Sequence, residues 1–160
     1  MQISPLRSLP SAFLGNWTGP DVHPDCPHLR VLLADDCSVN QLLGTALLAR
    51  WGIVPLLASN GMEAVELLVE GEFDIVFMDL EMPVMNGLNA ARSIRLFERT
   101  HRPGRKVPII AYTDTTWNSP AHLIRDSGFN ALLRKPSGSR EMGDCLLRWC
   151  PNELAGARLM

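Results

Sequence analysis

The amino-acid sequence predicts an α/β fold in which a doubly wound, five-stranded parallel sheet carries helices on both faces. Five short apolar segments alternate with segments of helical periodicity, which is the element order of such a sheet. The third apolar segment, residues 73–78 (FDIVFM), is almost uninterrupted, as expected of a strand buried on both faces. Four of the predicted strands lead directly into polar or charged residues. In open α/β sheets this edge is where ligands bind.

The composition is that of one globular domain. The chain has 160 residues, of which 46% are hydrophobic and 20% charged, and its net charge is −2. This balance gives no electrostatic footprint for nucleic acid or an anionic membrane. No apolar run is long enough to span a bilayer and the N-terminus matches a secretory signal poorly, so we expect a cytoplasmic protein. In that compartment we expect free thiols at all four cysteines: Cys26, Cys37, Cys145 and Cys150.

The first part of the chain divides into a leader and the opening strands and helix. Residues 1–28 hold five prolines and no regular periodicity, which is typical of a flexible leader. Residues 29–34 are the first predicted strand, and a helical stripe follows over residues 39–51. The second strand is predicted over residues 53–58. Because it contains Pro55, which cannot donate to a ladder, we expect it at an edge of the sheet.

The central part of the chain contains the second helix, the third strand and the third helix. Asn60 is expected to cap the second helix, with Glu63 as its capping-box partner. The third strand leads into a loop with proline and glycine, and the third helix is predicted over residues 87–98. The remaining predicted elements are a strand over 107–112, a helix begun by Ser119–Pro120 and ended by Gly128, a strand over 131–134, a helix over 140–150 and a tail over 151–160.

Side chains that can do chemistry follow four of these strands. Asp35 and Asp36 follow the first strand, Asp79 the third, Thr113 the fourth, and Lys135, with a proline after it, the fifth. Three carboxylates cannot all stay ionised in one pocket without a cation, because like charges raise each other's pKa. Oxygen ligands with room for water favour Mg²⁺ over zinc or copper. The sequence therefore predicts a magnesium site at the carboxyl edge of the sheet.

The ordered set DD, DxxMPxMxG, T and KP resembles the receiver domain of bacterial two-component response regulators, the chemotaxis-regulator-like family. The resemblance covers about residues 29–150, and it implies a flavodoxin-like sheet in the order 2-1-3-4-5. The DDCSVNQ segment and the long loop after the third helix are similar to the receivers of hybrid histidine kinases and phosphorelays.

The resemblance also implies roles for individual residues. Asp36 and Asp79 would bind Mg²⁺ directly, Asp35 through water, and Glu81 through its backbone carbonyl. Asp79 would be the phosphorylated nucleophile.

Two further residues would act on the transferred phosphoryl group. Lys135 would supply a cation to its oxygens, and Thr113 a hydroxyl donor. In the family, Lys135–Pro136 corresponds to a pair joined by a cis peptide bond.

Some positions depart from the family pattern. Glu81, Asp114 and Thr115 occupy positions that tune the reaction, and Asp114 stands where the family has a small residue. The aromatic residue of the family's switch is replaced by Leu132, which we expect in the core in both signalling states. Ser137 follows the proline where an apolar residue is usual.

The leading hypothesis is a single-domain receiver that takes a phosphoryl group on Asp79 from a histidine kinase or histidine phosphotransfer protein. It would then signal through a partner or relay the group, and it would catalyse only its own phosphorylation and dephosphorylation. Two alternatives remain. One is a degenerate receiver that binds partners without phosphorylation, which Asp114 and Leu132 keep open. The other is an aspartate-nucleophile phosphatase of the haloacid-dehalogenase type, in which the position of Glu81 would be a second aspartate.

Overall fold

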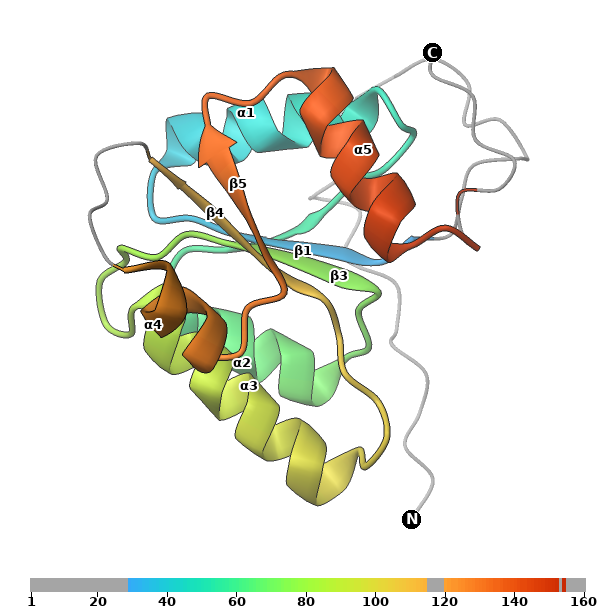
Figure 1. The fold of residues 1–160 in the computed structure, drawn as a ribbon. Helices are drawn as coiled ribbons and strands as arrows, with labels where there is room; N and C mark the ends of the chain where they lie inside the picture. The colour runs from blue at the N-terminus through green and yellow to red at the C-terminus, as the bar shows by residue number, and fades with distance from the viewer. Residues whose placement is uncertain (1–28, 115–119, 153, 155–160) are drawn as a thin grey trace.

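The structure is a computed structural model that describes residues 29–114, 120–152 and 154. Its centre is a parallel sheet of five strands in the order β2-β1-β3-β4-β5 (Figure 1), which confirms the predicted fold class and strand order. The strands are β1 (Val31–Ala34), β2 (Leu56–Ala58), β3 (Ile75–Met78), β4 (Ile109–Asp114) and β5 (Ala131–Lys135).

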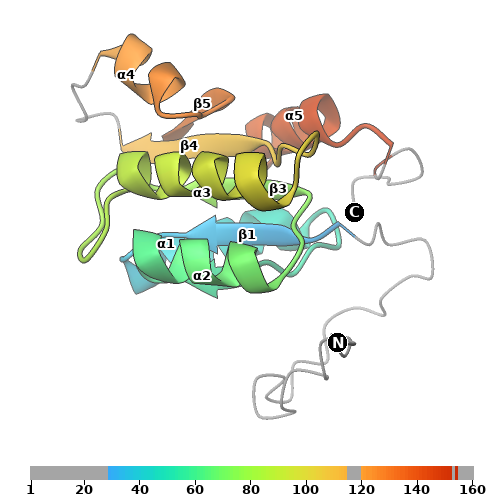
Figure 2. The same ribbon diagram turned by 90° about the horizontal axis from the view of Figure 1, so that it is seen from below.

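Helices cover both faces of this sheet. One face carries α1 and α5, and the other carries α2, α3 and α4 (Figure 1). On the second face α2 and α3 lie side by side (Figure 2). The helices are α1 (Ser38–Ala49), α2 (Gly61–Glu70), α3 (Gly87–His101), α4 (Ala121–Asp126) and α5 (Ser139–Trp149).

Alternate residues of the central strands supply two separate cores. In β1, Val31 and Leu33 point to the core under α1 and α5, whereas Leu32 and Ala34 point to the core under α2, α3 and α4. All four side chains of β1 and all four of β3 are buried, as expected of strands covered on both faces. Burial of this apolar surface is the main force that holds the sheet between its helices.

Several element boundaries differ from the predicted ones. Strand β2 begins at Leu56, so Pro55 precedes the ladder and does not lie within it, although β2 is an edge strand as expected. Helix α3 continues to His101, where Arg99 and His101 place basic side chains in its last turn. Strand β4 begins at Ile109, two residues later than predicted.

The starts of two helices also correct the sequence analysis. At α2, Asn60 caps as predicted, because its side chain accepts a hydrogen bond from Glu63 N at 2.9 Å. The Glu63 carboxylate accepts from the backbone of Ser59 at 2.7 Å and not from that of Asn60, so the reciprocal bond falls one residue earlier. Helix α4 begins at Ala121 with Pro120 at its N-cap, and Ser119 lies outside the described residues.

The ends of the described chain add to the core. Leu29 and Leu154 are both buried in the cluster under α1 and α5, although Leu154 belongs to the segment predicted as a tail. The predicted leader, residues 1–28, lies outside the described residues. Of the helices in the described part of the chain, none is long and apolar enough to cross a membrane.

Candidate functional site

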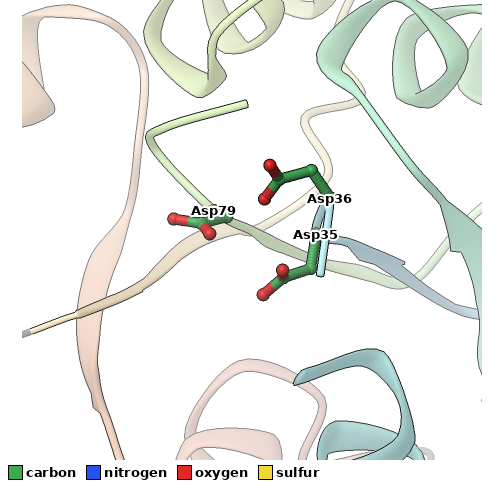
Figure 3. A group of neighbouring side chains, drawn as sticks. All are labelled: Asp35, Asp36 and Asp79. Atoms are coloured by element: carbon green, nitrogen blue, oxygen red, sulfur yellow. The ribbon is translucent and has the colours of Figure 1, made fainter. Parts of the chain in front are cut away.

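Three carboxylates converge at the carboxyl edge of the two central strands. Asp35 directly follows β1, Asp36 comes next, and Asp79 directly follows β3 (Figure 3). One oxygen from each side chain lies within 4.8 Å of the others. Asp35 is almost fully buried, whereas Asp36 is exposed. The pairing of β1 with β3 brings together residues that are 44 positions apart in the chain.

The ammonium group of Lys135 lies against two of these carboxylates. Lys135 ends β5, and its Nζ donates to Asp35 Oδ2 and, at 3.3 Å, to Asp79 Oδ2. Only 12% of the lysine side chain is exposed. Partial burial strengthens the attraction between opposite charges, so this lysine offsets part of the repulsion within the cluster.

The site shifts the pKa of both members of this contact. Burial raises the pKa of Asp79, the nearby charge of Lys135 opposes that shift, the Asp35 carboxylate adds to it, and the net direction is upward. Burial alone would lower the pKa of Lys135, but its hydrogen bond to Asp35 and the charge of Asp79 outweigh burial, and this pKa also rises. The lysine therefore stays a cation beside a carboxylate whose negative charge is disfavoured by its surroundings.

Backbone groups fix the carboxylates. Asp79 Oδ1 accepts from Leu80 N at 2.7 Å and from Glu81 N at 3.4 Å. Asp35 Oδ1 accepts from Cys37 N at 2.9 Å and from the Asn40 side chain at 3.3 Å. Each of these two aspartates thus has one oxygen held by local donors and the other directed to Lys135.

The loop from β3 to α3 is shaped by close backbone contacts. A Cβ at Gly87 would lie 2.1 Å from the carbonyl oxygen of Asp79, so only glycine fits there. Gly61 N, at the start of α2, donates to the carbonyl of Met85 at 2.9 Å. Between these contacts Val84 has a φ of 67°, which is a strained conformation for a β-branched residue.

The donor set fits a hard divalent cation. Asp35, Asp36 and Asp79 offer carboxylate oxygens only, and no sulfur or imidazole ligand belongs to this group. Mg²⁺ prefers such oxygen ligands and is usually bound by one or two carboxylates together with water. These three residues are the ones in the described part of the chain that could hold the predicted ion.

The other predicted residues lie around this cluster. Thr113 is buried near the end of β4, and Glu81 is exposed in the loop after Asp79. Asp114 ends β4, is exposed, and pairs in register with Lys135. Thr115 lies outside the described residues. The Lys135–Pro136 peptide bond is cis.

The expectation that Leu132 lies in the core is wrong. Its side chain is 41% exposed. Leu132 belongs to β5, which is an edge strand, and the helix that follows β4 on that face, α4, is only six residues long. The short helix and the edge position explain why a leucine here is left open to solvent.

Sequence reasoning missed the contacts of three residues that support the site, although Ser137 and the segment that contains Gln41 had been singled out. Gln41 Nε2 donates to the carbonyls of Asp35 and Ala58, at 2.7 and 3.1 Å, and so joins the ends of β1 and β2. Tyr112 places its ring 5.0 Å from Lys135 Nζ, and its hydroxyl is hydrogen bonded to Ser137 Oγ at 3.1 Å. The position of Gln41 five residues after Asp36 could have signalled its role, but nothing in the sequence connects Tyr112 with Ser137.

A cavity of about 670 Å³ opens beside Lys135. It lies between the exposed side of α1 and the ends of β4 and β5. Its lining is mainly apolar on the helix side and polar near the site, and it comprises Asn40, Leu43, Ala46, Leu47, Arg50, Tyr112, Asp114, Lys135, Pro136 and Ser137. The cavity therefore gives access along α1 to the lysine of the site.

Comparison with known proteins shows that the fold and the site belong to a domain type that is already known. The family profile of the response regulator receiver domain matches residues 31–146. A curated relative, the hybrid signal transduction histidine kinase K of Dictyostelium discoideum, is 35% identical over 115 residues, which are 70% of this chain and 9% of the kinase. The chain thus matches a small part of that protein's length.

Two solved structures are similar over most of their length. One is the receiver domain of the sensor histidine kinase PA1611 from Pseudomonas aeruginosa, which has a magnesium ion coordinated in its active-site cleft. It is 33% identical, with a TM-score of 0.67, over 76% of this chain and 96% of that one. The other is the Saccharomyces cerevisiae co-crystal of the histidine phosphotransfer protein Ypd1 with the receiver domain of Ssk1, at 32% identity and a TM-score of 0.69, over 77% of this chain and 89% of that one.

Proposed function

The chain belongs to the response regulator receiver domain family, and on this premise we propose that it accepts a phosphoryl group on Asp79 from a phosphohistidine donor. The observation that carries the proposal is the convergence of Asp79 with Asp35, Asp36 and Lys135 at one edge of the sheet. An acidic nucleophile, further acidic ligands for a cation and a buried lysine are the groups that transfer to a carboxylate needs.

Each residue of the site would have its own role in the transfer of the phosphoryl group. An oxygen of Asp79 forms a bond to phosphorus while the bond from phosphorus to the donor nitrogen breaks. The nitrogen keeps the electron pair and takes up a proton. Lys135 lies 3.3 Å from Asp79 Oδ2 and neutralises charge on the phosphoryl oxygens as they arrive. Thr113, near the end of β4, donates its hydroxyl to one of these oxygens.

Mg²⁺ is the cofactor that fits the negative charge of the three carboxylates that Lys135 does not neutralise. Asp36 and Asp79 would hold the ion directly and Asp35 through water, with the backbone carbonyl of Glu81 as a further ligand. When bound, the ion supplies positive charge to the reacting oxygens. The magnesium bound by the similar receiver of PA1611 supports this assignment. Glu81, Asp114 and Thr115 would then tune the rates of phosphorylation and dephosphorylation that the domain itself catalyses.

The donor would approach along α1. Val39, Leu42 and Leu43 are large apolar side chains exposed on the helix that starts beside Asp35. An exposed apolar group next to a reactive site is a usual mark of a docking surface. The likeness to the Ssk1 receiver, solved with Ypd1, supports a histidine phosphotransfer protein or a histidine kinase as the donor. From Asp79 the signal would leave through a partner protein, or the phosphoryl group would be relayed.

The exchange would take place in the cytoplasm. We expect the thiols of Cys37 and Cys145 to be reduced there. The phosphatase alternative lacks support, because the residue two positions after Asp79 is Glu81 and the chain belongs to a signalling family.

Intact-mass measurement tests the phosphoacceptor. Incubation with acetyl phosphate and Mg²⁺ should add the mass of one phosphoryl group to the wild type and none to Asp79→Asn. Asp144→Asn, an exposed aspartate on α5, is the matched control and should be phosphorylated like the wild type. Phosphorylation of Asp79→Asn would refute the assignment, and a folded wild type that never gains mass would favour the degenerate receiver.

A second variant separates the donor surface from the chemistry. Leu42→Glu places a charge on the exposed side of α1. It should slow transfer from a phosphorylated histidine phosphotransfer protein such as Ypd1 and leave the reaction with acetyl phosphate unchanged. Equal rates with the protein donor in variant and wild type would exclude docking at this position.

A further inference from the structure

The side chain of Tyr112 contacts Lys135, the lysine of the site. It belongs to β4, is 4% exposed and packs edge-on against Phe77 of β3, with ring centroids 6.2 Å apart at 72°. Its backbone pairs in register with Leu133, two residues before Lys135. The tyrosine therefore stands on the strand beside the lysine, with its ring held on one side by the core.

The ring face of Tyr112 meets the ammonium group. Lys135 Nζ lies 5.0 Å from the ring centroid, within the range of a cation–π interaction. Asp35 and Asp79 accept hydrogen bonds from the same nitrogen. The ammonium group of a lysine sits on a flexible stem of four carbons, so without a further restraint it can leave the cluster. The ring supplies such a restraint in addition to the two carboxylates.

Ser137 fixes the other end of the ring. Its Oγ is 3.1 Å from the Tyr112 hydroxyl, and it follows Lys135 by only two residues. A buried hydroxyl that loses its partner costs free energy, so this bond favours one placement of the ring. The segment that carries the lysine is thus tied to Tyr112 at two points, through the ammonium group and through Ser137.

We propose that Tyr112 is a positioning residue for Lys135, that its ring face keeps the ammonium group at the carboxylate cluster, and that Ser137 orients the ring. The inference rests on the proposed function in one respect, namely that Lys135 serves the phosphoryl transfer. Its structural part, the contact between ring and ammonium, stands independently of any reaction.

Selective labelling gives a direct measurement, because the chain contains only two lysines, Lys106 and Lys135. Protein labelled with ¹³Cε-lysine shows two side-chain signals, and Lys106→Arg assigns them. Protons above an aromatic ring resonate upfield, so the Hε signal of Lys135 should lie upfield of that of the exposed Lys106. In Tyr112→Leu the Lys135 signal should move downfield toward the Lys106 signal, which is the internal control.

Two further variants resolve the parts of the contact. Ser137→Ala should shift the Lys135 signal less than Tyr112→Leu does. Replacement of Tyr112 by pentafluorophenylalanine keeps the ring size and removes its attraction for a cation, so it tests the proposal even if Tyr112→Leu does not fold. It should reduce the time that Lys135 spends at the ring and shift the signal as well. A Lys135 signal that stays at its wild-type position in folded Tyr112→Leu and in the fluorinated protein would overturn the proposal.

The rate of phosphorylation by acetyl phosphate tests the consequence. Tyr112→Leu should lower the rate about tenfold, the scale expected for a partly buried cation–π contact, and Tyr112→Phe should lower it less, because it keeps the ring face and loses only the bond to Ser137. Phe73→Leu, which removes a ring at the other end of the sheet, is the matched control and should not change the rate. A wild-type rate in folded Tyr112→Leu would remove the positioning role. If the wild type itself is never phosphorylated, the proposed function fails while the lysine signals still decide whether the ring holds the ammonium group.

Discussion

The indole ring of Trp51, in the turn after α1, fills the space that a side chain at Gly143 of α5 would need. A Cβ at Gly143 would lie 1.8 Å from Cζ2 of Trp51. The indole nitrogen donates to the carbonyl of Ser139 at 3.3 Å, and Trp51 is buried. The two helices that cover one face of the sheet are thus joined by a ring packed on bare backbone.

This contact predicts that adding a single methyl group at Gly143 will lower the stability of the fold considerably. Gly143→Ala should lower the free energy of unfolding by roughly 2–3 kcal/mol, because a buried ring has to move to admit the methyl group. Urea denaturation measures the loss. Asp144→Ala, at the next and exposed position of α5, should change stability by only a few tenths of a kcal/mol. Equal stability of Gly143→Ala and wild type would show that the ring yields freely.

The strained backbone of Val84, in the loop after Asp79, predicts that a substitution there will raise the stability of the fold. Val84 has a φ of 67° and is 80% exposed, so its side chain contributes little packing in return for its strain. Val84→Asn should raise the free energy of unfolding by about 1 kcal/mol, because asparagine tolerates this conformation better. Val54→Asn, at an exposed valine without a positive φ, should give no such gain. Loss of stability in Val84→Asn would contradict the backbone assignment.

The carboxylate cluster predicts stabilisation by metal. Millimolar Mg²⁺ should raise the melting temperature, because the ion binds the folded chain and not the unfolded one. Asp36→Asn should weaken the shift markedly, and Asp144→Asn should leave it intact. Thermal unfolding monitored by circular dichroism with and without Mg²⁺ measures the effect. A wild type with no metal-dependent shift would exclude the site.

Burial predicts a pH-dependent reactivity at α5. Burial raises the pKa of Cys145 to about 11, against the opposing charge of Arg148. Its reactive thiolate is therefore scarce below that pH, about one molecule in a thousand at pH 8, and grows tenfold per pH unit toward 11. At pH 8 iodoacetamide should modify the exposed Cys37 before Cys145, as peptide mass spectrometry would show. In denaturant the two should react alike. Rapid modification of Cys145 in the folded protein at pH 8 would contradict the raised pKa.

The domain boundaries predict unequal effects at the two ends. Deletion of residues 1–28 should leave the free energy of unfolding unchanged, because the leader has little patterned apolar content. Leu154→Ala should lower that free energy by roughly 2–3 kcal/mol, because Leu154 is buried in the core under α1 and α5. A large loss on deleting the leader would mean that Phe13 or Trp17 packs on the domain.

The sequence was sufficient to predict those features of the site that depend only on the order and direction of the strands. Parallel strands direct all their carboxyl ends to one edge, so the order of apolar segments already brought Asp35, Asp79 and Lys135 together. The edge position of the second strand was predicted from Pro55, which was expected within the strand over residues 53–58; the strand is at an edge, although the proline precedes the ladder. The convergence of the strand ends follows from chain order and does not depend on side-chain detail.

Side-chain contacts and degrees of burial did not follow from the sequence. Leu132 was expected in the core from its hydrophobicity, but burial at an edge strand depends on the length of the neighbouring helix. The bond between Tyr112 and Ser137 depends on the register of β4 with β5, which no local pattern sets. The Glu63 carboxylate accepts from the backbone N–H of Ser59, one residue before the donor predicted for it, because the capping geometry depends on how the chain enters the helix.

The edge position of β5 has a consequence for how the protein fails under heat. Strand β5 pairs only with β4, whereas the strands that end in the aspartates lie at the centre of the sheet. An edge element opens at a lower free energy than the whole domain, and its amides exchange with solvent sooner. The lysine would then depart while the carboxylates stay in place. For the proposed transfer, competence would therefore be lost in a local opening that precedes global melting, and we expect phosphorylation to fail at a temperature below the melting temperature of the fold.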